Sequence, residues 1–229
     1  VSLWVIVWSK TNHQPTISDN ISSMGINNGE IGEKSLTIIG LEPGTTYYVR
    51  AYAKNEFGEG YSNQISITTS LTNYEVGDIG QAGGIIFYDK GNYSDGWRYL
   101  EATTENLGGP VWGCNGLLIN SNNEELGGGL ENTNLIIQNC NDNVSAAKLC
   151  ADYQQNGYSD WYLPSKEELR QMMLKRNSIG GFITGRYTSS TENSNTHSKG
   201  YNVINVIPGF QETNIPKQNN SYVRAIRRF

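Results

Sequence analysis

Residues 41–54 limit the first part of this chain to a β fold. A Pro-Gly turn is followed by a run in which Tyr47, Val49, Ala51 and Ala53 alternate with larger polar or charged residues. A period of two is that of a strand with one buried face. The first tyrosine of the run can hydrogen-bond back across the turn, as in the tyrosine corner of β-sandwiches. We therefore predict a sandwich in which one face of this strand lies in the core and the other faces solvent.

Three further segments rich in β-branched and aromatic residues are predicted strands, at 1–8, 35–39 and 64–69. Turn residues separate them. Residues 1–70 therefore form an all-β domain, and residues 71–75 form a short linker to the rest of the chain.

The segment 40–60, GLEPGTTYYVRAYAKNEFGEG, resembles fibronectin type III domains. It is similar to their penultimate strand, tyrosine corner and following hairpin, and the resemblance covers residues 1–69. It implies two further strands before residues 1–9, so we expect a partial domain, incomplete at its N-terminal end. Such domains act as spacers or protein-binding modules.

Residues 76–229 combine strand and helix patterns. A hairpin is predicted from 84–89 and 97–102, and strands return after residue 184. One helix is predicted at 145–156, and a second begins at Ser165, where a serine followed three positions later by a glutamate forms a capping box. This pattern predicts an α+β domain with two helices and a small antiparallel sheet.

The remaining parts of this second domain are less regular. Residues 103–131 carry many Gly and Asn residues without periodicity, and long loops of this kind are often functional. A short helix is predicted at 132–139 and a last strand at 222–229. The arginines of that strand are predicted to be solvated or paired at a sheet edge.

Several ordered motifs of this domain resemble the Lcl C-terminal domain family, which belongs with the C-type lectin-like folds. They are GDIGQAGGIIFYD at 77–89, VWGC at 111–114, NGYSDWYLPSKEEL at 156–169, RYTSSTEN at 186–193 and SYVRAIRRF at 221–229. The resemblance implies that the first and last strands pair, that two helices flank a twisted sheet, and that long loops carry recognition. Some members are surface adhesins reported to bind sulfated polysaccharides.

Composition narrows the possible partners. The net charge is −5, and an acidic chain lacks the basic face that nucleic acids and other polyanions require. The longest apolar runs are far shorter than the ~20 residues that span a bilayer. Abundant Gly, Asn, Ser, Thr and Tyr are typical of an extracellular binding protein. We expect a secreted or cell-surface location, with any export signal upstream of residue 1.

Three cysteines allow one intrachain disulfide. Cys140 and Cys150 are either bonded or two buried thiols, and we predict the disulfide. Formylglycine-generating oxidases share the lectin-like fold, but they need a redox-active cysteine pair late in the domain, and no cysteine follows Cys150. We predict no catalytic residues and no cofactor. The alternative to this absence of a cofactor is a calcium site, because the carboxylate of Asp142 and the amide oxygens of Asn139, Asn141 and Asn143 are ligands of the kind that calcium binds.

The favoured function is a non-catalytic surface or adhesion module that recognises a glycan or a protein through two loops, at 112–123 and 186–195. A structural piece of a larger surface protein with no small ligand comes second, and an enzyme third. Exposed apolar groups in a loop would favour binding over the structural role. The candidate ligand-binding residues are Trp112, Asn115, Asn122, Arg186, Tyr187 and Glu192.

Overall fold

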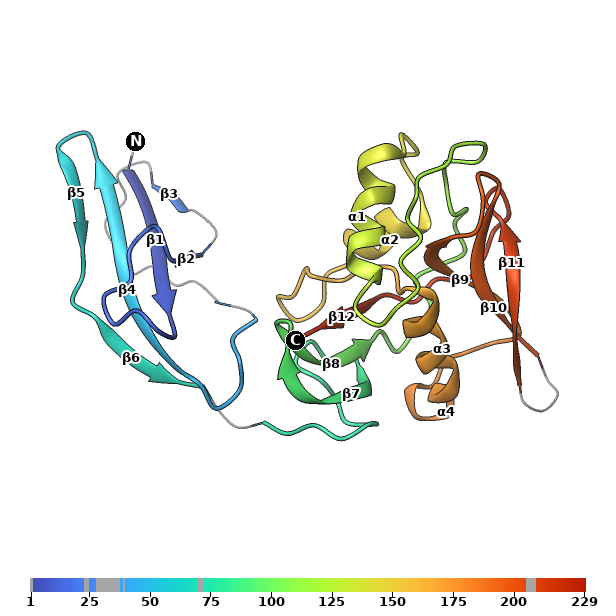
Figure 1. Cartoon of the computed structure of the whole chain (residues 1–229), viewed down its shortest axis with the longest axis horizontal. Coiled ribbons are helices and arrows are strands. Elements are labelled where there is room, and N and C mark those ends of the chain that lie inside the picture. Colours follow the sequence, from blue (N-terminus) through green and yellow to red (C-terminus); the bar gives the residue numbers. More distant parts are fainter. Residues whose placement is uncertain (1, 23–24, 28–37, 39, 70–71, 205–208) are drawn as a thin grey trace. The chain divides into compact units, whose positions relative to one another are not determined.

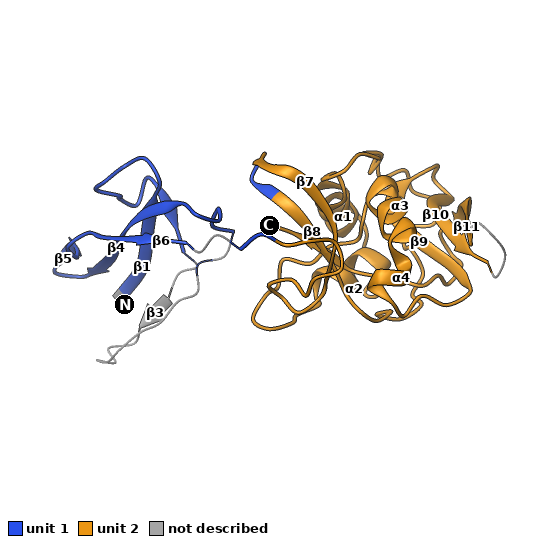
Figure 2. Ribbon diagram, turned by 90° about the horizontal axis from the view of Figure 1, so that it is seen from below, with its two compact units in different colours: residues 1–73, 95–97, 229 blue, residues 74–94, 98–228 orange. Residues whose placement is uncertain are grey.

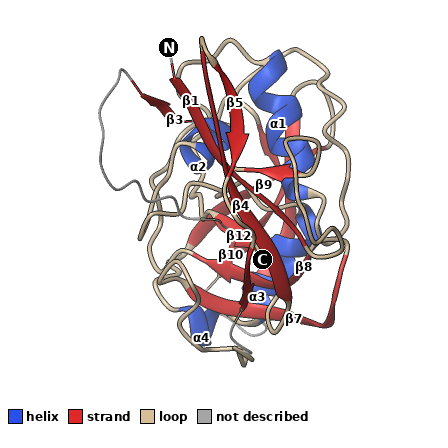
Figure 3. Cartoon of the chain, turned by 90° about the vertical axis from the view of Figure 1, so that its left-hand side faces the viewer, coloured by secondary structure: helices blue, strands red, loops and turns tan. Residues whose placement is uncertain are grey.

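The computed structural model describes residues 2–22, 25–27, 38, 40–69, 72–204 and 209–229, and the chain divides into two compact units. Figure 1 shows the chain coloured along its sequence, and Figure 2 colours the two units: unit 1 contains residues 1–73, 95–97 and 229, and unit 2 contains residues 74–94 and 98–228. The part of the chain that the structure describes holds twelve strands in three antiparallel sheets and four helices (Figure 3). The protein is therefore β-rich.

Unit 1 contains a six-stranded antiparallel sheet with the order β2-β1-β4-β5, in which β3 also pairs with β1 and β6 with β4. Its strands are β1 (Ser2–Ser9), β2 (Asn20–Ile21), β3 (Gly25–Asn27), β4 (Thr46–Asn55), β5 (Gly58–Tyr61) and β6 (Ile65–Thr68). Three of the predicted strands are confirmed as β1, β4 and β6. The strand predicted at 35–39 lies outside the described residues, apart from residue 38.

The buried side of β4 changes along the strand. Tyr47 and Val49 are buried on one face, but Ala51 and Ala53 of the same face are exposed, and Tyr52 of the opposite face is buried. Tyr52 lies directly opposite a buried valine of β1 and packs in the same apolar cluster. An aromatic ring removes far more apolar area from water than an alanine methyl group does. The prediction of one continuous core face was therefore wrong for the second half of the strand.

The turn before β4 is closed by the predicted tyrosine contact. The hydroxyl oxygen of Tyr47 accepts a hydrogen bond of 2.9 Å from the backbone N–H of Glu42. This contact confirms the predicted link across the corner and fixes the direction in which β4 leaves the turn.

Unit 2 contains two three-stranded sheets, with the orders β12-β8-β7 and β11-β10-β9. The strands are β7 (Ile85–Ser94), β8 (Trp97–Ala102), β9 (Gly185–Glu192), β10 (His197–Val203), β11 (Phe210–Pro216) and β12 (Ile226–Arg228). The predicted hairpin is confirmed, and its first strand is longer than expected. The last strand is shorter and pairs with β8, the second strand of the unit, rather than with the first.

Four helices complete the described part of unit 2: α1 (Gly129–Asn139), α2 (Ala146–Ala151), α3 (Lys166–Leu174) and α4 (Arg176–Ile179). Helices α1 and α2 pack together, and α1 and α3 both contact β9 (Figure 1). The predicted capping box is present: Ser165 accepts from the backbone N–H of Glu168, whose carboxylate accepts from the N–H of Ser165. Helix α2 ends five residues earlier than predicted. No helix in the described part of the chain has the length and apolar character needed to cross a bilayer.

The glycine-rich segment before β7 closes around a buried carboxylate. Glu101 accepts hydrogen bonds from the backbone N–H of Ala82 and of Gly84, and its Oε2 lies 3.0 Å from Nη1 of Arg227. A Cβ atom at Gly84 would lie 2.3 Å from the backbone carbonyl oxygen of Ala102, so only glycine fits there.

The C-terminal arginines were predicted to be solvated or paired at a sheet edge. Arg227 is paired with Glu101 and Asp160, but it is fully buried. The prediction was wrong for Arg224, which is 1% exposed and donates to the backbone carbonyls of Thr103 and Gly180.

Candidate functional site

Residues 111–121, here called the anchored loop, are held to the body of unit 2 at several points. Trp112 is 1% exposed, and its Nε1–H donates to the carbonyl of Ser189 on β9 over 2.8 Å. Its backbone N–H donates to the carbonyl of Lys217. Trp112 was predicted to contact ligand, and the structure contradicts this. Its indole instead fills the core beneath the loop, because a large apolar ring gains most from burial.

A buried ion pair holds the middle of the anchored loop. Nζ of Lys217 lies 2.5 Å from Oε1 of Glu192, and it also donates to the carbonyl of Leu117 over 2.8 Å. The Glu192 carboxylate accepts from the backbone N–H groups of Ile119 and Asn120, at 2.9 and 2.7 Å. Glu192, a predicted ligand residue, is therefore occupied by the protein itself. The ammonium lies 4.5 Å from the Trp112 ring centroid, within cation–π range.

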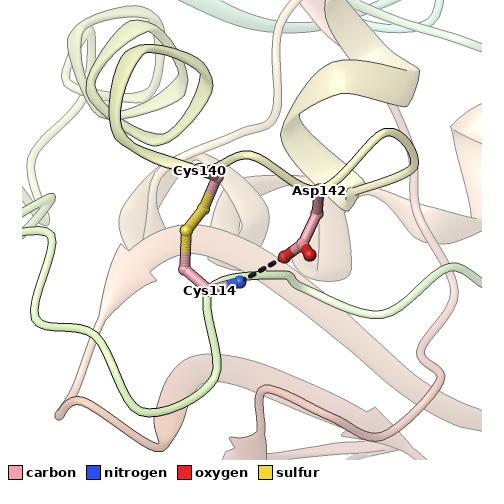
Figure 4. A group of neighbouring side chains, drawn as sticks. All are labelled: Cys114, Cys140 and Asp142. Atoms are coloured by element: carbon pink, nitrogen blue, oxygen red, sulfur yellow. Dashed lines mark hydrogen bonds between the residues drawn. A yellow bond between two sulfur atoms is a disulfide. The ribbon is translucent and has the colours of Figure 1, made fainter.

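A disulfide ties the start of the anchored loop to the end of α1. It joins Cys114 to Cys140, and Cys150 is a free thiol (Figure 4). The predicted bond between Cys140 and Cys150 is therefore wrong. Cys150 lies on α2 within the apolar core, where burial raises the pKa of its thiol well above the ordinary value.

Asp142 completes this corner of the molecule. Its Oδ2 accepts a hydrogen bond of 2.6 Å from the backbone N–H of Cys114 (Figure 4). Ligand atoms of Cys114, Cys140 and Asp142 lie within 4.8 Å of one another, but the two sulfur atoms are bonded together. The group therefore offers a cation only the carboxylate. Asn139, named in the calcium alternative, instead donates its side-chain amide to the carbonyl of Leu135 within α1.

The tip of the anchored loop carries apolar side chains into solvent. Leu117 is 56% exposed and Leu118 is 61% exposed. Asn115, a predicted ligand residue, is exposed beside them and donates its side-chain amide to Gln218 over 3.2 Å. A groove of about 410 Å³ adjoins the tip. It is lined by Val111, Gly113, Cys114, Asn115, Leu117, Asn141, Asp142, Lys217 and Gln218.

The sequence prediction did not include the two leucines. The sequence does contain a signal for them, because two adjacent leucines stand in a loop that has no strand or helix periodicity. Such residues have no predicted core to pack against, so they are expected to be exposed. Lys217 was missed as well, since nothing local marks a lysine as buried.

The second predicted loop proves to be part of β9 and the turn after it. Tyr187 is fully buried, with its ring centroid 5.0 Å from that of Phe182 and 5.3 Å from that of Tyr222. Its role as a ligand residue is therefore contradicted. Arg186 is exposed and lines a separate pocket, and Asn122 is exposed beyond the end of the anchored loop.

Comparison with known proteins leaves the family open. No family model and no curated protein sequence matches this chain. Among solved structures, a fimbrial protein from Bacteroides ovatus ATCC 8483 is similar, with a TM-score of 0.49 and 12% identity over 82% of this chain. The match covers 58% of that protein's length. The resemblances to fibronectin type III and Lcl C-terminal domains stay predictions.

Proposed function

We propose that this chain is a non-catalytic, extracellular or cell-surface binding module that recognises a glycan or a protein through the tip of the anchored loop. In this proposal residues 1–70 are a fibronectin type III-like spacer, and residues 76–229 are a lectin-like recognition domain. The observation that carries the proposal is the exposure of Leu117 and Leu118 on a loop that is otherwise fastened to the core.

The fastening favours recognition because it reduces the entropy lost on binding. A disulfide, a buried ion pair and the buried indole of Trp112 all hold residues 111–121 before any ligand arrives. Loops that are already ordered lose less conformational freedom when they bind, so more of the contact energy appears as affinity.

The chemistry of the tip suits a ligand with both apolar and polar faces. Leu117 and Leu118 offer apolar contact, while Asn115 and Gln218 offer amide donors and acceptors beside the groove. Apolar anchors surrounded by polar groups are the usual composition of a binding patch. We assign no cofactor to this site.

The cysteine arrangement supports a non-catalytic role. Cys114 and Cys140 are bonded to each other, and the Cys150 thiol is buried with a raised pKa. A reactive cysteine requires the opposite environment, one that is accessible and lowers the thiol pKa.

The test is a glycan-array screen of the full chain, with and without calcium, using wild type and Leu118→Asp. Ile79→Asp is the matched control, because Ile79 is a 70% exposed aliphatic residue of unit 2 that lies outside the anchored loop. We expect wild type and the control to bind the same glycans, and Leu118→Asp to lose at least about tenfold in affinity, which is about 1.4 kcal/mol. Equal binding by all three proteins would contradict the proposed site.

If the wild-type chain binds nothing on the array, wild type, Leu118→Asp and Ile79→Asp would be tested for binding to surface proteins of the cell envelope. Loss of a protein partner in Leu118→Asp alone would retain the proposal with a protein ligand. Absence of any partner that depends on the tip would favour the purely structural role.

A further inference from the structure

A second pocket of about 430 Å³ lies where β9 meets the segment before β12. It is lined by Gly109, Arg186, Asn220, Ser221 and Tyr222, and is here called the Arg186 pocket. Backbone hydrogen bonds join its two sides: the N–H of Tyr222 donates to the carbonyl of Arg186 over 2.8 Å, and the N–H of Thr188 donates to the carbonyl of Tyr222 over 3.2 Å. The pocket therefore has a rigid frame.

The charge of Arg186 has no counterion among the described residues. Within that part of the chain its side chain makes no ion pair and no hydrogen bond, whereas Arg98 and Arg227 are each paired with an aspartate. The described residues that line the Arg186 pocket include no acidic side chain. A guanidinium in this setting is free to bind an anion from solution.

The hydroxyl of Ser221 is a second unsatisfied polar group at the same pocket. Ser221 is 6% exposed, and its hydroxyl is one of three buried side-chain polar atoms in the described residues that make no hydrogen bond. Buried hydroxyl groups are normally satisfied by protein, water or ligand, because an unsatisfied one is destabilising. This oxygen has almost no accessible surface, so a ligand in the Arg186 pocket would become its partner once the serine side chain rotates toward the pocket.

The neutral part of the lining suits a sugar. Asn220 is exposed and its side-chain amide can donate to and accept from hydroxyl groups. The half-buried ring of Tyr222 offers an apolar face with a polar edge. The volume lies within the range of small-ligand pockets.

We propose that the Arg186 pocket binds a monosaccharide that carries a carboxylate group, with the carboxylate paired to the guanidinium of Arg186. A carboxylate matches the two parallel N–H groups of a guanidinium, which makes the pair both strong and directional. A chain of repeated anionic groups does not fit, since Arg186 is the only cation among the described residues that line the pocket and the whole chain carries a net charge of −5. This inference concerns a different pocket from the anchored loop and does not depend on the function proposed for that loop.

The test is a titration of the full chain with D-glucuronate, followed by two-dimensional NMR, beside D-glucose and D-glucose 6-sulfate. We expect glucuronate to shift the resonances of Arg186, Ser221 and Tyr222 at concentrations where glucose does not, and the sulfate to bind more weakly. Arg186→Gln should weaken glucuronate binding at least tenfold, Arg186→Lys less, and Ser221→Ala a few fold.

Two control variants show whether glucuronate binding belongs to the Arg186 pocket. Arg170→Gln removes an exposed arginine that pairs with Glu167 on α3, and it should leave glucuronate binding unchanged. Leu118→Asp should also leave it unchanged, which keeps the two proposed sites distinguishable. Glucuronate binding that is no stronger than glucose binding, that survives Arg186→Gln, or that is matched by the sulfate would overturn the proposal.

Discussion

Lys217 and Glu192 form an ion pair inside unit 2, with Nζ and Oε1 2.5 Å apart and side chains that are 0% and 2% exposed. Each partner also binds backbone groups of the anchored loop, so the pair acts as the loop's internal anchor. Removal of one partner leaves a buried charge without its counterion, which is among the most destabilising changes available to a protein.

We therefore expect Lys217→Met to lower the free energy of unfolding by about 3–5 kcal/mol. Urea denaturation measures the change, and hydrogen exchange should show faster opening of residues 117–120. Lys148→Met is the control, because Lys148 forms an exposed pair with Asp152 and should change stability by less than about 1 kcal/mol. Equal effects of the two variants would contradict the anchoring role.

Thiol labelling tests the assignment of the cysteines. In native protein the buried Cys150 should react slowly with iodoacetamide, since its thiol is inaccessible and its pKa is raised. In unfolded but unreduced protein Cys150 alone should be labelled, and peptide mapping should find Cys114 linked to Cys140. Label on Cys114 under those conditions would refute the pairing.

Loss of the disulfide should destabilise the chain. The bond closes a loop between positions 26 apart, for which chain entropy predicts about 3–4 kcal/mol. The double variant Cys114→Ser, Cys140→Ser should unfold at correspondingly lower urea concentration, whereas Cys150→Ala should show the smaller change of a core substitution. A double variant as stable as wild type would show that the bond does not constrain the unfolded chain.

The pH dependence of stability should carry a contribution from Glu168. Burial raises the pKa of this carboxyl above its ordinary value of 4.5, against the opposing effect of hydrogen bonds from Ser165, Gly127 and Tyr162. The folded protein then holds a proton that the unfolded chain has released, so this contribution is present below pH 4.5 and is lost as the pH rises through the folded pKa.

Urea unfolding at a series of pH values from about 4 to 8 measures this effect as the difference between wild type and Glu168→Gln. We expect the stability of wild type relative to the variant to fall as the pH rises. A relative gain instead would mean that the three hydrogen bonds to the carboxylate outweigh its desolvation.

Tyr47 gives a test in unit 1. Tyr47→Phe removes the acceptor for the N–H of Glu42 and should cost about 0.5–1.5 kcal/mol. Tyr48→Phe is the matched control on the opposite face of β4, where the ring contacts His13 and the described residues offer its hydroxyl no hydrogen bond. Equal unfolding free energies for the two variants would show that the corner contact adds nothing.

The features that sequence reasoning predicted well depend on residues close together in the chain. Ser165 and Glu168 are three positions apart, and Tyr47 reaches back five positions to Glu42. Their geometry follows from local backbone preferences, so a pattern of a few residues is enough to predict them. Six of the twelve described strands, β1, β4, β6, β7, β8 and β12, were predicted from local patterns of the same kind.

The candidate site was harder because its contacts join distant segments. The Trp112 indole bonds to a carbonyl 77 positions away, and Glu192 meets backbone groups more than 70 positions away. A tryptophan or a glutamate in a polar loop looks the same in sequence whether it faces solvent or core. The disulfide shows the same limit: Cys150 is nearer to Cys140 in sequence, but the fold brings Cys114 to it instead.

The covalent link at the base of the anchored loop also determines how the chain can respond to a pulling force. Residues 115–139, including the whole of α1, lie inside the ring that the bond between Cys114 and Cys140 closes. At roughly 3.5 Å per extended residue, the 26-residue span corresponds to about 90 Å of chain that tension applied at the two ends cannot draw out. Leu117, Leu118 and the groove-lining Asn115 all lie within this ring. The rest of unit 2 can therefore unfold under tension without the tip being pulled into an extended chain.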